Sequence, residues 1–396
     1  MPSSDEASHV RRVLNVVSLI AFATALFTRA VDPIVPPIAR DLAVPPATVA
    51  LLSTAFALPF ALIQPLLGPI ADMVGKTRIM LLCLSVLLVA ATIAAVATSF
   101  PALLVTRIVA GMAAGGIFPV AVAIIGDLVA VAQRQVALGR YMAIVVSGNL
   151  LGTSLSGVVN DIAGWRSVFV VCAVCGAVAW IAAVIGLRGV KNDGPARLDL
   201  KSIPASYRAI FANPRAKVCF GAVFVEGVAI FGLFPYMALL LIARGEPRAA
   251  IAGAVLAGFA LGGIAYALLV RILLGRLAPG RLMMLGGGIA AVALLAVAPT
   301  LPWPVELGVL AVMGFGFYML HNCIQLQATE IAPTGRGAAT ALHSSAFFLG
   351  TAVGPVAYGF GLAHLGAAPT LAAGAVGMAL TGWACARLFR DREPPA

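Results

Sequence analysis

Long apolar stretches separated by short polar connections run through the chain from end to end. Each stretch supplies about the 20 mainly apolar residues that an α-helix needs to cross a bilayer. The pattern predicts an all-α polytopic membrane protein with twelve transmembrane helices, at 13–36, 47–70, 78–98, 101–126, 136–160, 165–187, 217–243, 249–272, 281–299, 304–328, 337–362 and 367–388.

The composition agrees with this pattern. Hydrophobic residues make up 61% of the 396 residues and charged residues only 10%, whereas a soluble domain has about 45–50% and about 25%. A water-soluble enzyme is excluded. The sequence Ala21-Phe22-Ala23 is similar to a leader cleavage site, but the apolar run continues to Val31, so we expect an uncleaved first helix.

A charged segment divides the predicted helices into two halves. We expect an N-terminal six-helix bundle at 1–187, a cytoplasmic linker at 188–216 and a C-terminal six-helix bundle at 217–396. The halves repeat, because the glycines of helix 5 (Gly148, Gly152, Gly157) recur in helix 11 (Gly350, Gly354, Gly359) at one constant interval. Parallel six-helix repeats are typical of a two-lobed transporter with its site between the lobes. The same small residues also allow close helix packing.

Lysine and arginine set the predicted orientation. With the N-terminus in the cytoplasm, basic residues gather in the inside segments: Arg11, Arg12, Lys76, Arg78, Arg134, Arg140, the central linker, Arg271, Arg276, Arg281, Arg336, Arg387, Arg390 and Arg392. The outside segments hold only Arg40, Arg166, Arg244 and Arg248. The positive-inside rule therefore places both termini in the cytoplasm. It also accounts for the net charge of +11 without a nucleic-acid partner.

The connection between helices 2 and 3 resembles a signature of the major facilitator superfamily, G-x-x-x-D-x-x-G-[RK]-x-[RK]. The matching residues are Gly68, Asp72, Gly75, Lys76 and Arg78. The resemblance implies that Asp72 acts in a cytoplasmic gate, where a carboxylate is favourable at a helix N-terminus. It also implies a monomer that works by alternating access.

Two further segments are similar to motifs of this superfamily. Arg107-x-x-x-Gly111 resembles its helix 4 motif, and the helix 5 glycines resemble the motif of antiporters without the usual proline. Asp32, which precedes a run of prolines in helix 1, is similar to the acidic residue of the twelve-helix drug:proton antiporter branch. The resemblance implies proton-coupled efflux of drug-like molecules from the cell, across a bacterial inner membrane.

Few ionisable residues lie inside the predicted helices, and each is a functional candidate because burying it in a bilayer is costly. Asp32 and Arg107 fall at comparable depth, and Arg29 shares a helix face with Asp32. We expect Asp32 to bind and release a proton, with both arginines adjusting its affinity. The alternative is a permanent structural ion pair at the end of the helix.

Polar residues of other helices complete the candidate substrate cavity. Glu226 falls near the middle of helix 7 and is a candidate for binding a cation or proton. The remaining candidates are His321, Gln325, His343, Asn149 and Gln64. Each could instead make a structural hydrogen bond. At the cytoplasmic ends we expect latches that contain Asp127, Arg134, Glu330 and Arg336.

No enzyme class is indicated, because the sequence has no Walker A motif, no Cys/His metal cluster and no paired-carboxylate motif. Cys172 and Cys175 are interpreted as small hydrophobic residues, and no metal, cofactor or disulfide framework is expected. We expect the partners to be protons, membrane lipid and a small organic substrate. Uptake or exchange of a carboxylate or sugar-like metabolite remains the alternative to drug export, and a sensor without flux a further one.

The hypothesis for Asp32 gives a first prediction. Asp32→Asn removes the site for the proton while keeping the size of the side chain, so transport driven by a pH gradient should be lost. Substrate flux in proteoliposomes measures it. A variant that keeps full proton-driven flux would leave Asp32 as a structural residue.

Overall fold

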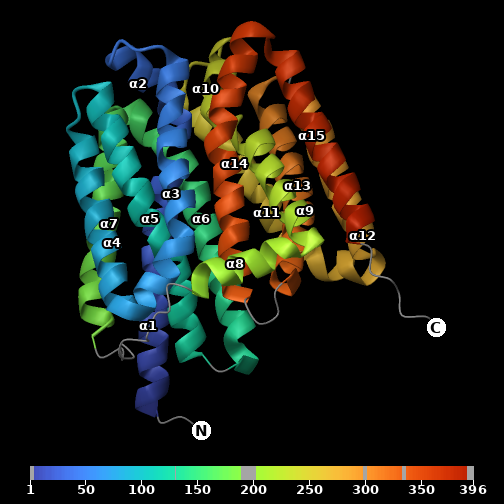
Figure 1. Cartoon of the computed structure of the whole chain (residues 1–396). Helices are drawn as coiled ribbons and strands as arrows, with labels where there is room; N and C mark the ends of the chain where they lie inside the picture. Colours follow the sequence, from blue (N-terminus) through green and yellow to red (C-terminus); the bar gives the residue numbers. More distant parts are fainter. Residues whose placement is uncertain (1–3, 130, 189–201, 298–300, 332–335, 390–396) are drawn as a thin grey trace. The chain divides into compact units, whose positions relative to one another are not determined.

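The computed structural model describes residues 4–129, 131–188, 202–297, 301–331 and 336–389, and within them every regular element is a helix (Figure 1). Twelve segments are long and apolar enough to cross a membrane, which confirms the predicted number of spans. The helices are α1 (Ser4–Arg29), α2 (Val35–Asp41), α3 (Pro46–Val74), α4 (Lys76–Ala95), α5 (Phe100–Leu128), α6 (Val131–Ala163), α7 (Trp165–Gly186), α8 (Ser202–Ala212), α9 (Pro214–Glu226), α10 (Phe234–Ile242), α11 (Ala249–Arg276), α12 (Pro279–Ala296), α13 (Trp303–Ile331), α14 (Arg336–His364) and α15 (Ala367–Leu388).

The chain folds into two compact units. Unit 1 consists of residues 1–198 and 248–253, and unit 2 of residues 199–247 and 254–396. Unit 1 holds the first six spans, and unit 2 holds the other six apart from the first residues of α11.

Glycines bring helix backbones into direct contact in unit 1. A Cβ at Gly111 of α5 would collide with the carbonyl of Phe56 in α3, and one at Gly115 would lie 2.7 Å from the carbonyl oxygen of Phe60. On another face, Gly148 and Gly152 of α6 lie against α1 in the same way. Only glycine, which has no side chain beyond a hydrogen atom, therefore fits where these helices cross.

Unit 2 uses the corresponding glycines for the same purpose. Gly350 of α14 lies directly against the carbonyl of Phe224 in α9, and a Cβ at Gly354 would come within 2.7 Å of Gly232. The repeated glycine pattern thus packs the fifth span of each half against the first span of that half.

The first span is not the single helix that the sequence predicts over 13–36. After α1 ends at Arg29, a short 3₁₀ segment (Asp32–Ile34) leads into α2, and the span extends to Asp41. Pro33, Pro36 and Pro37 explain the break, because proline has no N–H to bond to the carbonyl four residues earlier.

The seventh span is interrupted as well, whereas the sequence predicts a continuous helix over 217–243. α9 ends at Glu226 and is followed by a π-helical turn, Gly227–Phe231, before α10 begins at Phe234. Pro235 has no N–H for the carbonyl of Phe231, which favours an irregular turn at this point. Such π turns occur frequently at functional sites.

Ion pairs fasten the ends of spans in each unit. In unit 1, Asp41 accepts hydrogen bonds from Arg166 at 2.7 Å and from the Trp165 indole at 3.1 Å. In unit 2, Arg244 donates to the fully buried Glu306 at 2.6 Å and to the carbonyl of Val297 at 2.5 Å.

The segment predicted as a linker, 188–216, is helical in part. Its second half contains α8 and the start of α9, while 189–201 lies outside the described residues. Ile210 and Phe211 give α8 an apolar side, which the abundance of charge in this segment concealed. The proposed boundaries of the two halves remain a prediction.

The glycine contacts lead to a stability prediction. Gly111→Ala should lower the free energy of unfolding by about 1–3 kcal/mol, because the added methyl group forces α3 and α5 apart. Thermal unfolding of the purified protein in detergent measures the change. Gly126→Ala is the matched control in the same helix, since a Cβ there meets nothing within 4 Å. Equal melting temperatures for the two variants would contradict the packing argument.

Candidate functional site

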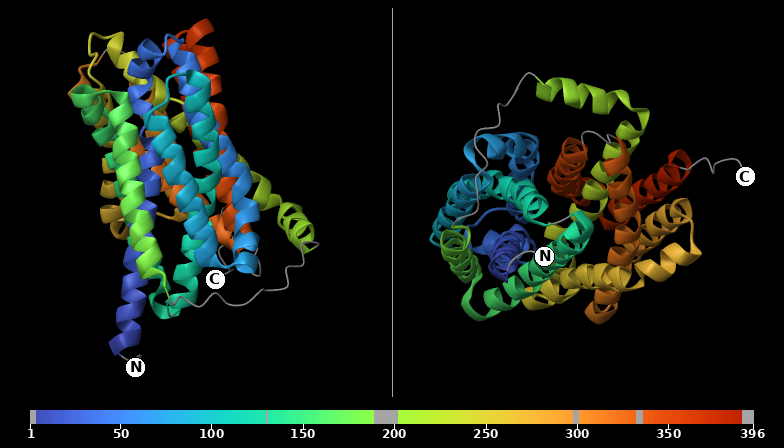
Figure 2. Two further views of the ribbon diagram at one scale, coloured as in Figure 1. Left: turned by 90° about the vertical axis from the view of Figure 1, so that its left-hand side faces the viewer. Right: turned by 90° about the horizontal axis from the view of Figure 1, so that it is seen from below.

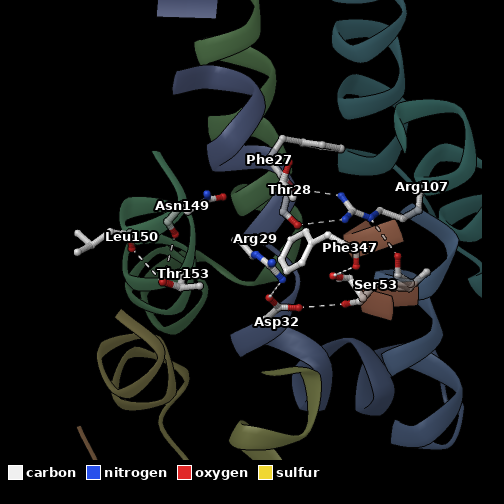
Figure 3. A network of polar contacts seen from close by, with 12 residues as sticks. Phe27, Thr28, Arg29, Asp32, Ser53, Arg107, Asn149, Leu150, Thr153 and Phe347 are labelled. Carbon is white, nitrogen blue, oxygen red and sulfur yellow. Dashed lines mark hydrogen bonds and ion pairs between the residues drawn. The ribbon is translucent and has the colours of Figure 1, made fainter. Parts of the chain in front are cut away.

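Asp32 lies at the break in the first span, and its side chain is 2% exposed. Its Oδ1 accepts a hydrogen bond from the Ser53 hydroxyl of α3 at 3.0 Å, and its Oδ2 lies 3.6 Å from Nη1 of Arg29 (Figure 3). Oδ2 accepts no hydrogen bond from the described residues. One oxygen of the carboxylate is thus held by a hydroxyl, and the other lies beside a cation without a hydrogen bond.

Arg107 is fully buried in α5 and links three helices. Its guanidinium donates to the carbonyl oxygens of Phe27, Thr28 and Leu52 at 3.2, 3.5 and 3.4 Å. Phe27 and Thr28 belong to the last turns of α1, where carbonyls lose their helical partners and a cation is favourable. Among the described contacts Arg107 therefore binds main-chain oxygens and donates no hydrogen bond to Asp32.

Two aromatic rings cover the guanidinium of Arg107. Its Cζ lies 4.9 Å from the ring centroid of Phe27 and 4.4 Å from that of Phe56. Cation–π contacts of this kind stabilise a guanidinium that has lost its water. Arg107 is an anchored charge rather than a mobile one.

Other polar candidates of unit 1 lie on neighbouring helices. Asn149 of α6 is half-buried, and its main-chain carbonyl accepts a hydrogen bond from the Thr153 hydroxyl at 3.4 Å (Figure 3). Gln64 of α3 is buried, and neither atom of its amide has a hydrogen-bond partner among the described residues. The sequence analysis did not predict a role for Ser53. A serine in an apolar helix is common, and only the structure shows that its hydroxyl contacts Asp32.

A polar contact in the interior of unit 2 joins Glu226 and His321. Oε2 of Glu226, at the end of α9, lies 2.8 Å from Nδ1 of His321 in α13. Glu226 is fully buried, and its Oε1 has no partner among the described residues. At this distance one of the two atoms donates a hydrogen to the other, and which one donates depends on the tautomer of the ring. Oε1 of Glu226 is the oxygen of the pair that makes no hydrogen bond among the described residues.

His343 adds a second imidazole to this pair. Its ring centroid lies 5.4 Å from that of His321, and its Nε2 is buried without a partner among the described residues. Gln325 follows His321 by one helical turn in α13 and is half-buried. The structure thus brings together three of the predicted residues in unit 2, namely Glu226 of α9, His321 of α13 and His343 of α14.

Phenylalanines surround the histidines, and the sequence analysis did not predict them. Phe317 stacks on the ring of His321 at 4.9 Å, and Phe347 lies 5.2 Å from the same ring. Phe231, in the π-helical turn, contacts Phe317 and Phe347 at 5.5 and 5.3 Å. These residues are far apart in sequence, so only the fold reveals the cluster.

The motif between α3 and α4 is described in part. Gly75 has φ +105°, a conformation that side chains rarely adopt, and it forms the sharp turn between the helices. Nζ of Lys76 lies 2.5 Å from Oδ2 of Asp127, which joins the start of α4 to the end of α5. Arg78 is exposed. Gly68 and Asp72 belong to α3, but their exposure and contacts lie outside what the structure describes.

The structure describes only some of the contacts of the residues predicted to form cytoplasmic latches. Arg134 donates to the carbonyls of Gly126 and Val129 at 2.6 and 3.5 Å, so it ties together the connection between α5 and α6. Glu330 is exposed near the end of α13, and the side chain of Arg336 lies outside the described residues.

The six cysteines, including Cys172 and Cys175, are all free thiols that form no disulfide bond.

Two curated bacterial proteins are similar to part of the chain. It is 29% identical over 205 residues to the multidrug transporter protein MdtP of Bacillus subtilis, covering 51% of this chain and 38% of the relative. It is 29% identical over 163 residues to the quinolone resistance protein NorA of Staphylococcus aureus, covering 41% and 42%. The chain therefore spans only about two fifths of the length of these curated relatives.

Solved structures share the fold over nearly the whole chain. A bacterial homologue of the human lysosomal transporter Spinster, in an inward-facing and unoccupied conformation, matches with a TM-score of 0.74 at 19% identity, covering 100% of both chains. The human organic anion transporter MFSD10 (TETRAN) matches with a TM-score of 0.70 at 18% identity, covering 94% of this chain and 99% of that one.

The sequence profile of the Major Facilitator Superfamily matches residues 17–355, which is most of the chain. This match agrees with the twelve spans, the repeated glycines and the carboxylates at the helix breaks. The chain thus belongs to the Major Facilitator Superfamily.

Proposed function

We propose that the protein exports small drug-like organic molecules in exchange for protons. The observation that carries this proposal is a buried carboxylate at a break in the first span of each half. Asp32 is the first residue of the 3₁₀ segment, and Glu226 directly precedes the π-helical turn. Interrupted spans with ionisable residues are typical of the ion sites of secondary transporters. Transport would proceed by alternating access, with the two halves moving against each other.

The two carboxylates have different partners, and this suggests different roles. Asp32 is held by a hydroxyl and by an arginine, which is always charged. Glu226 is bonded to His321, whose charge can change, and His343 lies next to that ring. We assign proton exchange to both sites, with the Glu226–His321 pair able to pass a proton between its two members.

The names of the relatives support a drug-like substrate. MdtP is a multidrug transporter protein and NorA a quinolone resistance protein, and both align with part of this chain. The phenylalanines around His321 offer the apolar, aromatic surroundings that a lipophilic molecule requires. Asn149 and Gln325, both half-buried, are proposed as further contacts.

The alternative function is uptake or exchange of an organic solute such as a carboxylate or sugar-like metabolite. One observation favours it: Arg29 and Arg107 place two cations against the one carboxylate of Asp32 in unit 1. MFSD10, which shares the fold, is an organic anion transporter. Arg107 donates to three main-chain carbonyls, so its charge would stay beside Asp32 whichever solute is bound.

We also propose that the protein is a monomer of the bacterial inner membrane with both termini in the cytoplasm. The distribution of lysine and arginine along the sequence supports this orientation. Protons, a small molecule and membrane lipid are the proposed partners.

Glu226→Gln provides the decisive test in unit 2. The amide keeps the shape of the side chain but cannot carry a proton, so export driven by a pH gradient should fall by at least about tenfold. The assay measures flux of cationic drugs, neutral drugs and small organic acids in proteoliposomes with an imposed gradient. Substrate binding at equilibrium should change far less than gradient-driven flux.

Glu330→Gln is the matched control, because this glutamate is exposed near the C-terminal end of α13, whereas Glu226 is buried. Its flux should still depend on the pH gradient, because a residue of a cytoplasmic latch would change the overall rate of transport and not its coupling to protons. Drug export that ignores the gradient would disprove proton coupling, and uptake of organic acids would favour the alternative function.

A further inference from the structure

A short helix with exposed basic residues lies where the seventh span begins. α8 has 11 residues and is about 16 Å long at 1.5 Å per residue, far too short to cross a bilayer. It runs across the direction of α9 and α14 rather than along them (Figure 1), and the view along the spanning helices shows it lengthwise (Figure 2, right). Only Asn213 separates it from α9.

The corner between α8 and α9 is fixed in place by three contacts within unit 2. The Asn213 side chain accepts from the N–H of Arg215 at 3.0 Å and donates to the carbonyl of Ile331 at 3.2 Å. Ile210 is buried, and the ring of Phe211 packs edge-on against Phe220 at 5.6 Å. Because α9 begins the seventh span, this corner holds α8 at the level of the membrane surface.

The exposed side of the corner combines a large apolar ring with positive charge. Phe211 remains 47% exposed although it contacts Phe220, and Arg208, Arg215 and Lys217 are all exposed. At 3.6 residues per turn, Arg208 lies about 60° from Phe211 and about 160° from the buried Ile210. One side of α8 therefore packs on the protein, while the other presents the ring together with a guanidinium.

Acidic residues are scarce around this surface. The sequence contains no Asp or Glu between Lys201 and Val225. Glu330, beside Ile331, contributes one exposed negative charge against the three positive ones. An exposed aromatic ring with basic residues at the start of a span fits the boundary between phospholipid headgroups and acyl chains.

We propose that α8 and the first turn of α9 form a binding surface for anionic phospholipid. Arg208, Arg215 and Lys217 bind the phosphates of the headgroup layer, and Phe211 inserts among the upper acyl chains. Each basic residue near such a surface strengthens binding by about fivefold. This inference is independent of the transported substrate, since it concerns the outer surface of unit 2 alone.

The test maps lipid contacts on the full-length protein in vesicles. Phosphatidylglycerol and phosphatidylcholine, each with a photoreactive headgroup, are compared at equal amounts, and cross-links are located by mass spectrometry. We expect phosphatidylglycerol to label residues 207–217 at least about tenfold more than phosphatidylcholine. The triple variant R208Q/R215Q/K217Q should lose this preference.

The triple variant R271Q/R276Q/R281Q is the matched control, because it removes the same charge from exposed residues of unit 2 around the α11–α12 connection. It should keep the preference at residues 207–217. Equal labelling by the two lipids in the unchanged protein would overturn the proposal, as would equal losses in the two triple variants. Displacement of the lipid by soluble glycerol 3-phosphate would also overturn it, because it would indicate a site for free anions.

Discussion

A peptide group that loses its helical hydrogen bond inside a bilayer must find another partner within the protein, because the hydrocarbon offers none. The end of α1 at Arg29 creates such a loss, because carbonyls in the last turn of a helix have no helical partner. Arg107 donates to two of these carbonyls, those of Phe27 and Thr28, and it reaches α3 at the same time. The interruption that places Asp32 inside unit 1 thus depends on an arginine from a distant part of the chain.

Close packing of main chains provides the rigid surroundings for these interruptions. Glycines put α5 against α3 and α6 against α1 in unit 1, and α14 against α9 in unit 2. The helices that lead into the breaks, α1 and α9, are therefore held by contacts that cannot be relaxed by turning a side chain. Polar groups at the breaks keep their positions without a dense network of ion pairs.

The sequence was sufficient for the twelve spans, because each is an apolar stretch of the right length, and for the family, because Gly75, Lys76 and their neighbours form a recognisable motif. It also identified Asp32, Glu226, His321 and His343 as rare polar residues in apolar helices. It did not show that Glu226 meets His321 or that Asp32 meets Ser53, since these contacts join residues far apart in sequence. The π-helical turn was missed because one proline in a long apolar run usually only bends a helix.

The fixed position of Arg107 has an electrostatic consequence. With Arg29 it gives the polar cluster around Asp32 one net positive charge while the aspartate is ionised, and two once a proton has bound. The arginines keep their charge in both states. A positively charged molecule near this cluster would be repelled more strongly after the proton arrives, and a negatively charged one attracted more strongly. The same proton would thus expel a cation from the vicinity of unit 1 or draw in an anion, so the sign of the substrate's charge would decide between exchange and co-transport.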